Sequence, residues 1–347
     1  MRVHEKEQSF YFPLTQKPQF ISFDCGNHYL KTVALEYAIP ELKAQLTSEP
    51  DPISRIYAAE ALGKKGGLES VKALSAALTK DPFWGVRAEV AKQLSKIKLD
   101  QAFDGLTPGL KDTDARVRRA VVEALATIKT NASYKALKPI VKSGDESYYV
   151  EAAACRAVGE IAAVATDKPK EEKVLKLLKT VLTEKAGWNE LVRSGAIAGL
   201  AALKTSEAAL DIILEYTKLG VPQSLRLGSI RALGKISVGQ SSPNLEKILG
   251  RLTELAKETF FLTQVAVVTA LGAMETPKAL GILQSLASQT ADGRVRRRAE
   301  EQIAQVQKNI GTEKTLRQLR EELDQLKHLN QKLQSRLENL EALSKKE

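Results

Sequence analysis

The sequence predicts an all-α solenoid of about eight stacked helix pairs, preceded by a short β segment and followed by a coiled-coil helix. Three observations predict this architecture: a recurring amphipathic phrase, an aromatic stretch broken by proline near the N-terminus, and a heptad pattern at the C-terminus. We assign the β segment to residues 1–37, the solenoid to residues 38–310 and the coiled coil to residues 311–347.

The N-terminal stretch does not have a helical pattern. Residues 7–33 alternate aromatic and β-branched side chains, and Pro13 and Pro18 interrupt the alternation. This favours two short strands or an extended edge, ending in a turn at Gly26 and Asn27. Because two strands alone are only marginally stable, we expect this segment to pack on the first repeat or on a partner outside the chain.

One phrase recurs through the central region: an apolar residue, a basic residue, several small residues, and then Leu-Gly or a similar pair. The copies lie about 31 to 42 residues apart, a spacing typical of stacked helix pairs, and they resemble HEAT repeats. One pair alone cannot bury its apolar face, so neighbouring pairs must stack. The copies lie at or near Arg55, Arg87, Arg118, Glu151, Arg193, Arg226, Val265 and Arg296.

Turn residues separate the two helices of several units, and Asp and Pro there should cap and start the second helix. We expect the recurring arginine to pair with an inter-helix Asp of its own or a neighbouring repeat. The copy at Glu151 lacks this arginine and the copy near Val265 lacks a charge, which either local packing or a partner surface would explain. The turns are Asp51-Pro52, Asp81-Pro82, Asp112-Thr113-Asp114 and Asp292-Gly293.

The C-terminal segment has a heptad pattern with Leu at every d position and Asn at one a position. A buried Asn pairs best with the same Asn of a parallel partner, so the pattern favours a parallel homodimer. A different partner chain, or a helix that folds back on the solenoid, remains an alternative. The predicted dimerisation residues are Leu316, Leu319, Leu323, Leu326, Asn330, Leu333, Leu337 and Leu340.

The net charge of +10 can favour nucleic acid or an acidic membrane surface. Most basic residues nevertheless alternate with acidic ones, so we do not expect nucleic acid as the partner. The chain has no apolar run of the roughly 20 residues that a membrane span requires. Two distant cysteines and no apolar leader favour a cytoplasmic location. The dense basic clusters, assigned to solvated or intra-repeat roles, are Arg116, Arg118, Arg119 and Arg294, Arg296, Arg297, Arg298.

The run from Phe23 to Lys31, FDCGNHYLK, resembles the end of the β-sandwich domain in zinc aminopeptidases of the aminopeptidase N type. In that family an Asp-Pro-Gly-like turn and a Leu-Lys lead into the helical C-terminal domain, which is a HEAT-like array in some bacterial members. Cys25 stands where the family usually has Pro. The resemblance implies a β-domain junction at Asp24, Gly26, Asn27, Leu30 and Lys31.

The catalytic parts of those enzymes are missing from this sequence. They bind zinc through His-Glu-x-x-His on one helical face, whereas the three histidines here, His4, His28 and His328, never have that spacing. We therefore expect no catalytic residues, no metal, no cofactor and no enzymatic activity. The predicted function is a non-catalytic scaffold that resembles the accessory tail of such a peptidase. We expect its partner to be a protein or peptide bound on the concave face of the solenoid, or a separate catalytic or β-domain.

A second hypothesis is enzymatic, because some HEAT-like proteins are bilin lyases or DNA glycosylases. A role on DNA would use basic residues of the concave face together with Trp84 and Trp188 to hold a distorted base. The same tryptophans could instead simply cover the edge of a repeat. A phycobilin lyase-like protein would bind a chromophore.

Overall fold

The computed structural model of the chain describes residues 4–32, 36–164, 169, 171–274, 276–308 and 310. These residues form an all-helical solenoid, and helices account for all the regular secondary structure among them. The elements are α1 (Ile39–Ser48), α2 (Pro52–Lys65), α3 (Gly67–Lys80), α4 (Trp84–Leu94), α5 (Asp100–Leu106), η1 (Thr107–Lys111), α6 (Ala115–Ile128), α7 (Asn131–Ser143), α8 (Tyr148–Val164), α9 (Glu171–Glu184), η2 (Trp188–Glu190), α10 (Leu191–Leu200), α11 (Glu207–Glu215), α12 (Gln223–Ser237), α13 (Ser242–Ala256), α14 (Phe261–Gly272) and α15 (Lys278–Gln289). A last helix covers residues 293–308.

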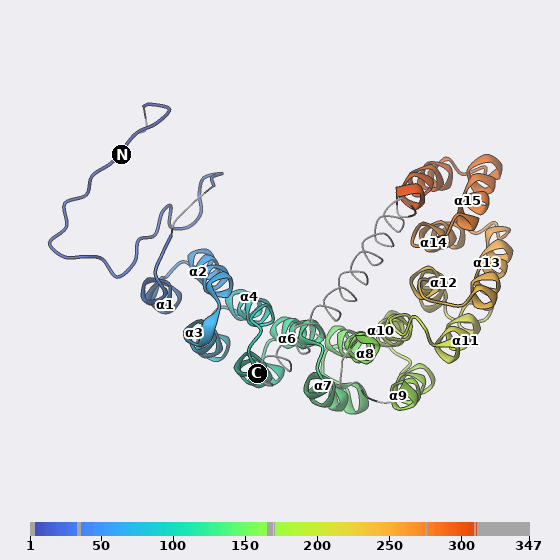
Figure 1. Cartoon of the computed structure of the whole chain (residues 1–347), viewed down its shortest axis with the longest axis horizontal. Coiled ribbons are helices and arrows are strands. Elements are labelled where there is room, and N and C mark those ends of the chain that lie inside the picture. The colour runs from blue at the N-terminus through green and yellow to red at the C-terminus, as the bar shows by residue number, and fades with distance from the viewer. Residues whose placement is uncertain are drawn as a thin grey trace, which may run out of the picture. The chain divides into compact units, whose positions relative to one another are not determined.

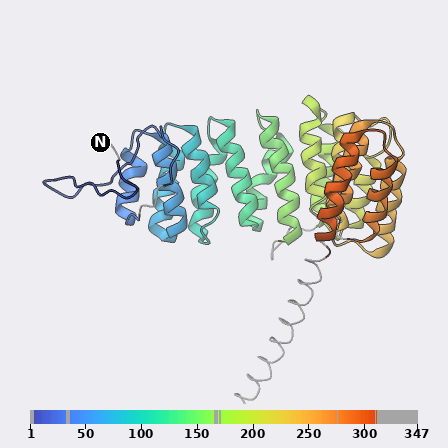
Figure 2. The same ribbon diagram turned by 90° about the horizontal axis from the view of Figure 1, so that it is seen from above.

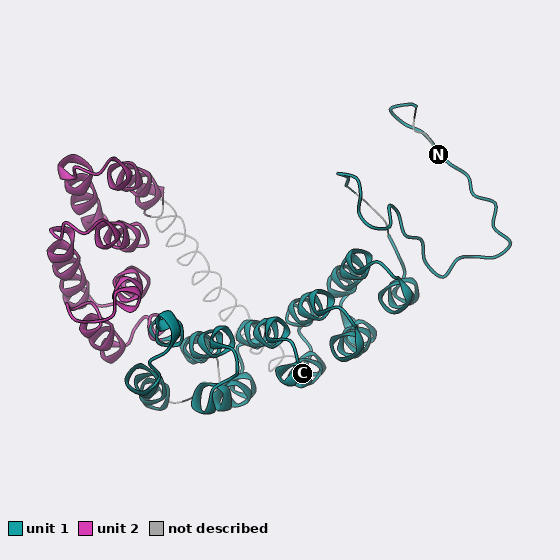
Figure 3. Cartoon of the chain, turned by 180° about the vertical axis from the view of Figure 1, so that it is seen from behind, with its two compact units in different colours: residues 1–199 teal, residues 200–347 magenta. Residues whose placement is uncertain are grey.

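These helices alternate between first and second members of a pair and make eight pairs in the described part of the chain, as the sequence predicts. The chain divides into two compact units, residues 1–199 and 200–347 (Figure 3). In the first unit, α2, α4, α6 and α8 pack side by side as one layer, and α3, α5, α7 and α9 belong to the other (Figures 1 and 2). In the second unit α12 packs on α14, and α13 packs on α15.

Local sequence explains where several helices begin. The carboxylate of Asp51 accepts hydrogen bonds from the backbone N–H groups of Ile53 and Ser54, and Pro52 occupies the first turn of α2. Asp114 caps α6 in the same way. Asp81 differs from the prediction: it follows α3 and accepts from the N–H of Phe83, which is itself the N-cap residue of α4.

The core lies between the two helix layers of each unit. Small and branched apolar residues of the recurring phrase are fully buried, including Ala59 on α2, Val90 on α4 and Val121 on α6. Leucines of the first helices, such as Leu74 and Leu137, fill the opposite side. This burial is the packing that a single pair could not provide alone.

The β segment expected near the N-terminus is wrong for the described residues 4–32, which contain no strand. The segment finds no neighbouring backbone to form a ladder, so its aromatic alternation cannot become a sheet. It is instead fastened to the first helix pair by side chains: Lys17 pairs with Glu41 at 2.7 Å, and the hydroxyl of Ser22 donates to Glu49.

The turn predicted inside this segment is present. The N–H of Asn27 donates to the carbonyl of Asp24 at 2.8 Å, and Gly26 and Asn27 have φ values of 89° and 54°. The carboxylate of Asp24 also accepts from the backbone N–H of Tyr29 at 3.0 Å and from Lys31. Leu30 is fully exposed. The residues assigned to a β-domain junction therefore form a self-contained turn.

The predicted coiled coil lies outside the described residues. This applies to all of the dimerisation residues from Leu316 to Leu340, Asn330 among them. The zipper and the homodimer therefore stay predictions.

Candidate functional site

A ladder of ion pairs links successive helix pairs in the first unit. Arg55 on α2 donates from Nε and Nη2 to the two carboxylate oxygens of Asp81, at 2.8 and 3.0 Å. Arg87 on α4 makes the same two-point contact with Asp112, at 2.7 and 2.9 Å. Each arginine thus reaches from its own helix to the inter-helix turn of the next pair, which confirms the expected structural role.

The third rung of this ladder joins α6 to the turn before α8. Arg118 donates to Asp145 from Nε and Nη2, at 2.9 and 2.7 Å, and its Nη1 donates to the carbonyl of Asp112 at 2.9 Å. Asp145 also accepts from the N–H of Ser147. Each rung therefore fixes two turns at once, through one planar guanidinium with matched acceptors.

The contacts of the second rung favour the charged forms of both Arg87 and Asp112. The carboxylate of Asp112 raises the pKa of Arg87 through a direct hydrogen bond. Burial acts to raise the pKa of Asp112, but the hydrogen bonds from Arg87 and from the N–H of Asp114 outweigh it, so that pKa lies below its usual value. The rung is consequently ionised throughout the neutral pH range.

The fourth rung has the opposite polarity. Glu151 on α8 occupies the arginine position of the phrase, and Nζ of Lys185, just after α9, lies 2.9 Å from its carboxylate. The Glu151 side chain is only 9% exposed and that of Lys185 is 25% exposed. The acidic residue lies on the helix and the basic residue lies in the turn. The pair therefore has zero net charge, as the regular rungs do, although both positions differ from theirs.

Close backbone contact between α8 and α10 surrounds this reversed rung. A Cβ added to Gly159 would lie 2.0 Å from the carbonyl oxygen of Gly199, and one added to Gly195 would lie 2.4 Å from that of Ala152. Only glycine leaves room for the helices at these points. Lys185, directly after α9, is held against α8 by its contact with Glu151.

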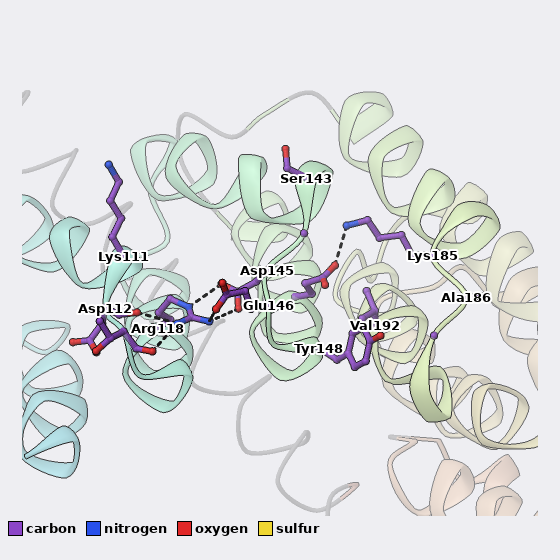
Figure 4. Close-up of a pocket in the computed structure, with 14 residues that line it drawn as sticks. Lys111, Asp112, Arg118, Ser143, Asp145, Glu146, Tyr148, Lys185, Ala186 and Val192 are labelled. Carbon is purple, nitrogen blue, oxygen red and sulfur yellow. Dashed lines mark hydrogen bonds and ion pairs between the residues drawn. The ribbon is translucent and has the colours of Figure 1, made fainter.

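An open pocket of about 920 Å³ lies between the third and fourth rungs. Figure 4 shows Arg118 and Asp145 on one side of the pocket and Lys185 on the other. Its lining combines three basic side chains, several carboxylates, one aromatic ring and two glycines. These residues are Lys111, Asp112, Thr113, Arg118, Ser143, Gly144, Asp145, Glu146, Tyr148, Glu151, Lys185, Ala186, Gly187 and Val192.

Two aromatic side chains directly follow the lining residues Tyr148 and Gly187 in the chain. Tyr149, next to the lining residue Tyr148, has its ring centroid 6.4 Å from that of Trp188, and Trp188 is 59% exposed. The guanidinium of Arg119 lies 5.9 Å from the Tyr149 ring. Exposed aromatic surface therefore lies next to a pocket whose lining carries both acidic and basic groups.

Trp84, the second tryptophan singled out in the sequence, lies in a different environment. The guanidinium of Arg116 covers its ring at 3.6 Å and pairs with Asp114 at 2.6 Å. The hydrogen bond from Arg116 lowers the pKa of Asp114 to about 2. Trp84 is therefore already stacked against Arg116, whereas Trp188 offers a large exposed surface.

The second unit shows what other substitutions do to the ladder. Arg226 pairs with Glu258 at 2.5 Å, which repeats the regular polarity. In the copy near Val265 the rung is neutral, because Gln264 takes the arginine position and contacts the hydroxyl of Thr290 at 3.4 Å. A changed rung is thus matched by a changed partner here as well.

Cys155 lies on α8 one turn beyond Glu151 and is fully buried. Burial raises the pKa of its thiol to about 12, so the group is a neutral thiol at physiological pH. A thiol in this state does not act as a nucleophile. The other cysteine, Cys25, is exposed and also free.

Sequence reasoning found part of this site. It singled out Glu151 and Trp188, which the structure brings to one region, but it missed Lys185 and Tyr149. Lys185 stands where the turns of the three regular rungs carry Asp, and a basic residue paired with the one acidic phrase position was the available signal. Among the described residues, no group of three or more His, Cys, Asp or Glu side chains could hold a metal ion.

Residues 39–126, 98–159 and 222–304 match the HEAT-repeat family. The matched segments cover more than half of the chain, and the chain therefore belongs to that family. None of the described helices combines the length and the apolar character needed to cross a membrane.

A bilin biosynthesis protein, PecE of Nostoc sp. (strain PCC 7120), is 26% identical over 224 residues, which are 64% of this chain and 82% of PecE. Similar solved structures include the CpcE–CpcF complex of phycocyanin lyase from Nostoc, with 19% identity over 80% of this chain and 98% of that one, at a TM-score of 0.43. Human deoxyhypusine hydroxylase has 21% identity over 78% and 96%, at a TM-score of 0.34.

The similarity to PecE corrects two expectations. A relative that functions in bilin biosynthesis and is matched over most of its length overturns the interpretation of the chain as a non-catalytic scaffold, as in a peptidase tail. It also overturns the expectation that the chain has no enzymatic role. The expectation rested on the absence of metal and nucleophile motifs from the sequence, and such an absence does not exclude an enzymatic role.

Proposed function

We propose that this HEAT-repeat protein binds a bilin, a linear tetrapyrrole, and assists its attachment to a cysteine of an acceptor protein. The observation that carries the proposal is the similarity to PecE over 224 residues. The pocket beside the Glu151–Lys185 pair is the proposed site. Its volume of about 920 Å³ falls within the usual range for small-molecule sites.

The chemistry of a bilin fits the groups around this pocket. A bilin carries two propionate carboxylates, a row of ring nitrogens and an extended conjugated system. Lys111 offers a cation for a propionate, and Glu146, whose side chain is 96% exposed, offers a carboxylate for the ring N–H groups. Tyr148 and Trp188 offer aromatic faces for the conjugated rings.

The attachment reaction also has matching groups. In this reaction the cysteine thiol of the acceptor protein adds across an exocyclic double bond of the bilin. A C–S bond forms at one carbon of that double bond, and the thiol proton is transferred to the other carbon. Glu151 and Lys185, 2.9 Å apart, form a couple that can accept and return a proton. Because Cys155 is buried with a pKa of about 12, the reacting thiol in this proposal belongs to the acceptor protein.

Titration of the full chain with biliverdin tests the proposal. We expect saturable binding with a changed visible absorption band and quenching of tryptophan fluorescence. Quenching should be stronger in Trp84→Phe, which keeps only Trp188, than in Trp188→Phe, which keeps only Trp84. An unchanged absorption band, or no saturation of the quenching, would contradict the proposed function.

A further inference from the structure

A second pocket of about 460 Å³ lies between α7 and α9, on the first-helix layer of the first unit. Four lysines border this pocket: Lys138 and Lys142 on α7, and Lys173 and Lys176 on α9. Its lining contains no arginine, unlike the lining of the proposed bilin pocket. We call these four residues the lysine groove. Lys185 also borders this pocket, but its ammonium group is engaged with Glu151.

The positive charge of the lysine groove is poorly balanced by acidic side chains. Glu184 is the single acidic side chain that lines the pocket, and it is exposed. Within the described residues, Lys138, Lys142, Lys173 and Lys176 have no ion pair, although many other lysines of the chain do. Lys138 and Lys142 are one helical turn apart, so like charges repel along α7 as well as across the groove.

The floor of the groove is closed by apolar side chains. Tyr134, Val141 and Val181 are at most 5% exposed, and Lys138 is half-buried above them. Burial raises the pKa of the Tyr134 hydroxyl, which therefore contributes no negative charge. An incoming anionic group would consequently meet the lysine ammonium groups at the rim.

These features decide between classes of anionic partner. Sites for single-stranded nucleic acid combine cations with exposed aromatic faces on which bases stack, and the one aromatic lining residue, Tyr134, is buried. Arginine, which suits bidentate contacts to phosphate, is absent from the lining. A trough between two adjacent helices has the shape that receives one polypeptide segment.

We propose that the lysine groove binds an acidic polypeptide segment of a partner protein. The segment would place Asp or Glu side chains against lysines of both helices, and the neutralised charges would remove the repulsion along α7. This inference rests on the geometry of α7 and α9 and is independent of bilin binding.

Fluorescence anisotropy with a labelled oligoglutamate peptide, using the full chain, tests this inference. We expect binding that weakens as salt concentration rises. The double variant Lys142→Glu/Lys173→Glu should lower the affinity by at least about tenfold. The charge-matched control Lys64→Glu/Lys65→Glu, at the exposed end of α2, should lower it by less than about twofold.

Three results would overturn the inference. The first is no binding of oligoglutamate at low salt. The second is an equal loss of affinity in both double variants, which would mean attraction by net charge alone. The third is tighter binding of a single-stranded oligonucleotide or of inorganic polyphosphate than of oligoglutamate through the same lysines. Circular dichroism of each variant distinguishes loss of binding from loss of fold.

Discussion

The regular rungs of the first unit and the reversed rung at Glu151 use the same geometry with opposite charges. At the regular rungs, a buried helix arginine reaches a turn aspartate through two hydrogen bonds, as Arg55 does with Asp81. At the reversed rung, Glu151 on the helix receives a single contact from the more exposed Lys185. The comparison teaches that the array tolerates a change of polarity if both partners change, and that the reversal accompanies an open, mixed-charge pocket.

The largest effect should follow from breaking a regular rung. Arg55→Ala would leave the buried Asp81 carboxylate, which is 4% exposed, without its ion-pair partner. We expect the free energy of unfolding to fall by about 3–5 kcal/mol. Chemical denaturation followed by circular dichroism measures it. The double variant Arg55→Met/Asp81→Leu should recover only part of the loss, because the N–H of Phe83 loses its acceptor. A single variant as stable as the parent would refute the buried role.

A somewhat smaller effect should follow from separating the helices around the reversed rung. Gly159→Val places atoms where the backbone of Gly199 lies, so α8 and α10 must move apart. We expect a loss of about 1–3 kcal/mol in the free energy of unfolding. Gly281→Ala on α15, where an added Cβ meets nothing, is the control and should not destabilise the protein. Equal behaviour of the two variants would show that the close contact is not required.

Removal of one partner of the reversed rung should cost less than removal of a buried arginine. Lys185→Ala leaves Glu151 unpaired, but the lysine side chain is 25% exposed and water can reach the site. We expect a loss of about 1 kcal/mol, discounted for that exposure. Denaturation at two salt concentrations measures it. A loss as large as that of Arg55→Ala would mean that the two kinds of rung do not differ.

The smallest effect near neutral pH concerns protonation. The pKa values of Asp112 and Asp114 are lowered on folding, that of Asp114 to about 2, so their contribution is complete above the unfolded value near 3.8. It is lost as the pH falls from about 4 toward 2. Melting temperatures should therefore be constant from pH 7 to about 5 and fall below about 4. Arg87→Ala should reduce the part of this fall that belongs to Asp112.

The sequence predicted the repeat architecture well because the arginine phrase is both periodic and amphipathic. It also predicted the pairing of Arg55, Arg87 and Arg118 with turn aspartates. The strands failed because alternation in residues 7–33 describes a side-chain pattern, whereas a strand also requires a neighbouring backbone. The pocket was not predicted, because its lining residues come from several helices and turns that are far apart in the sequence and meet only in the folded array.

The most direct test of the central claim restores regular polarity at the reversed rung. Glu151→Arg with Lys185→Glu keeps an ion pair and the net charge but gives the site the arrangement of the other rungs. Arg55→Glu with Asp81→Arg is the matched control at a regular rung. We expect the first double variant to stay folded and to bind biliverdin at least about tenfold more weakly, while the control binds as the parent does. Unchanged biliverdin affinity in the first variant would contradict the assignment of this pocket.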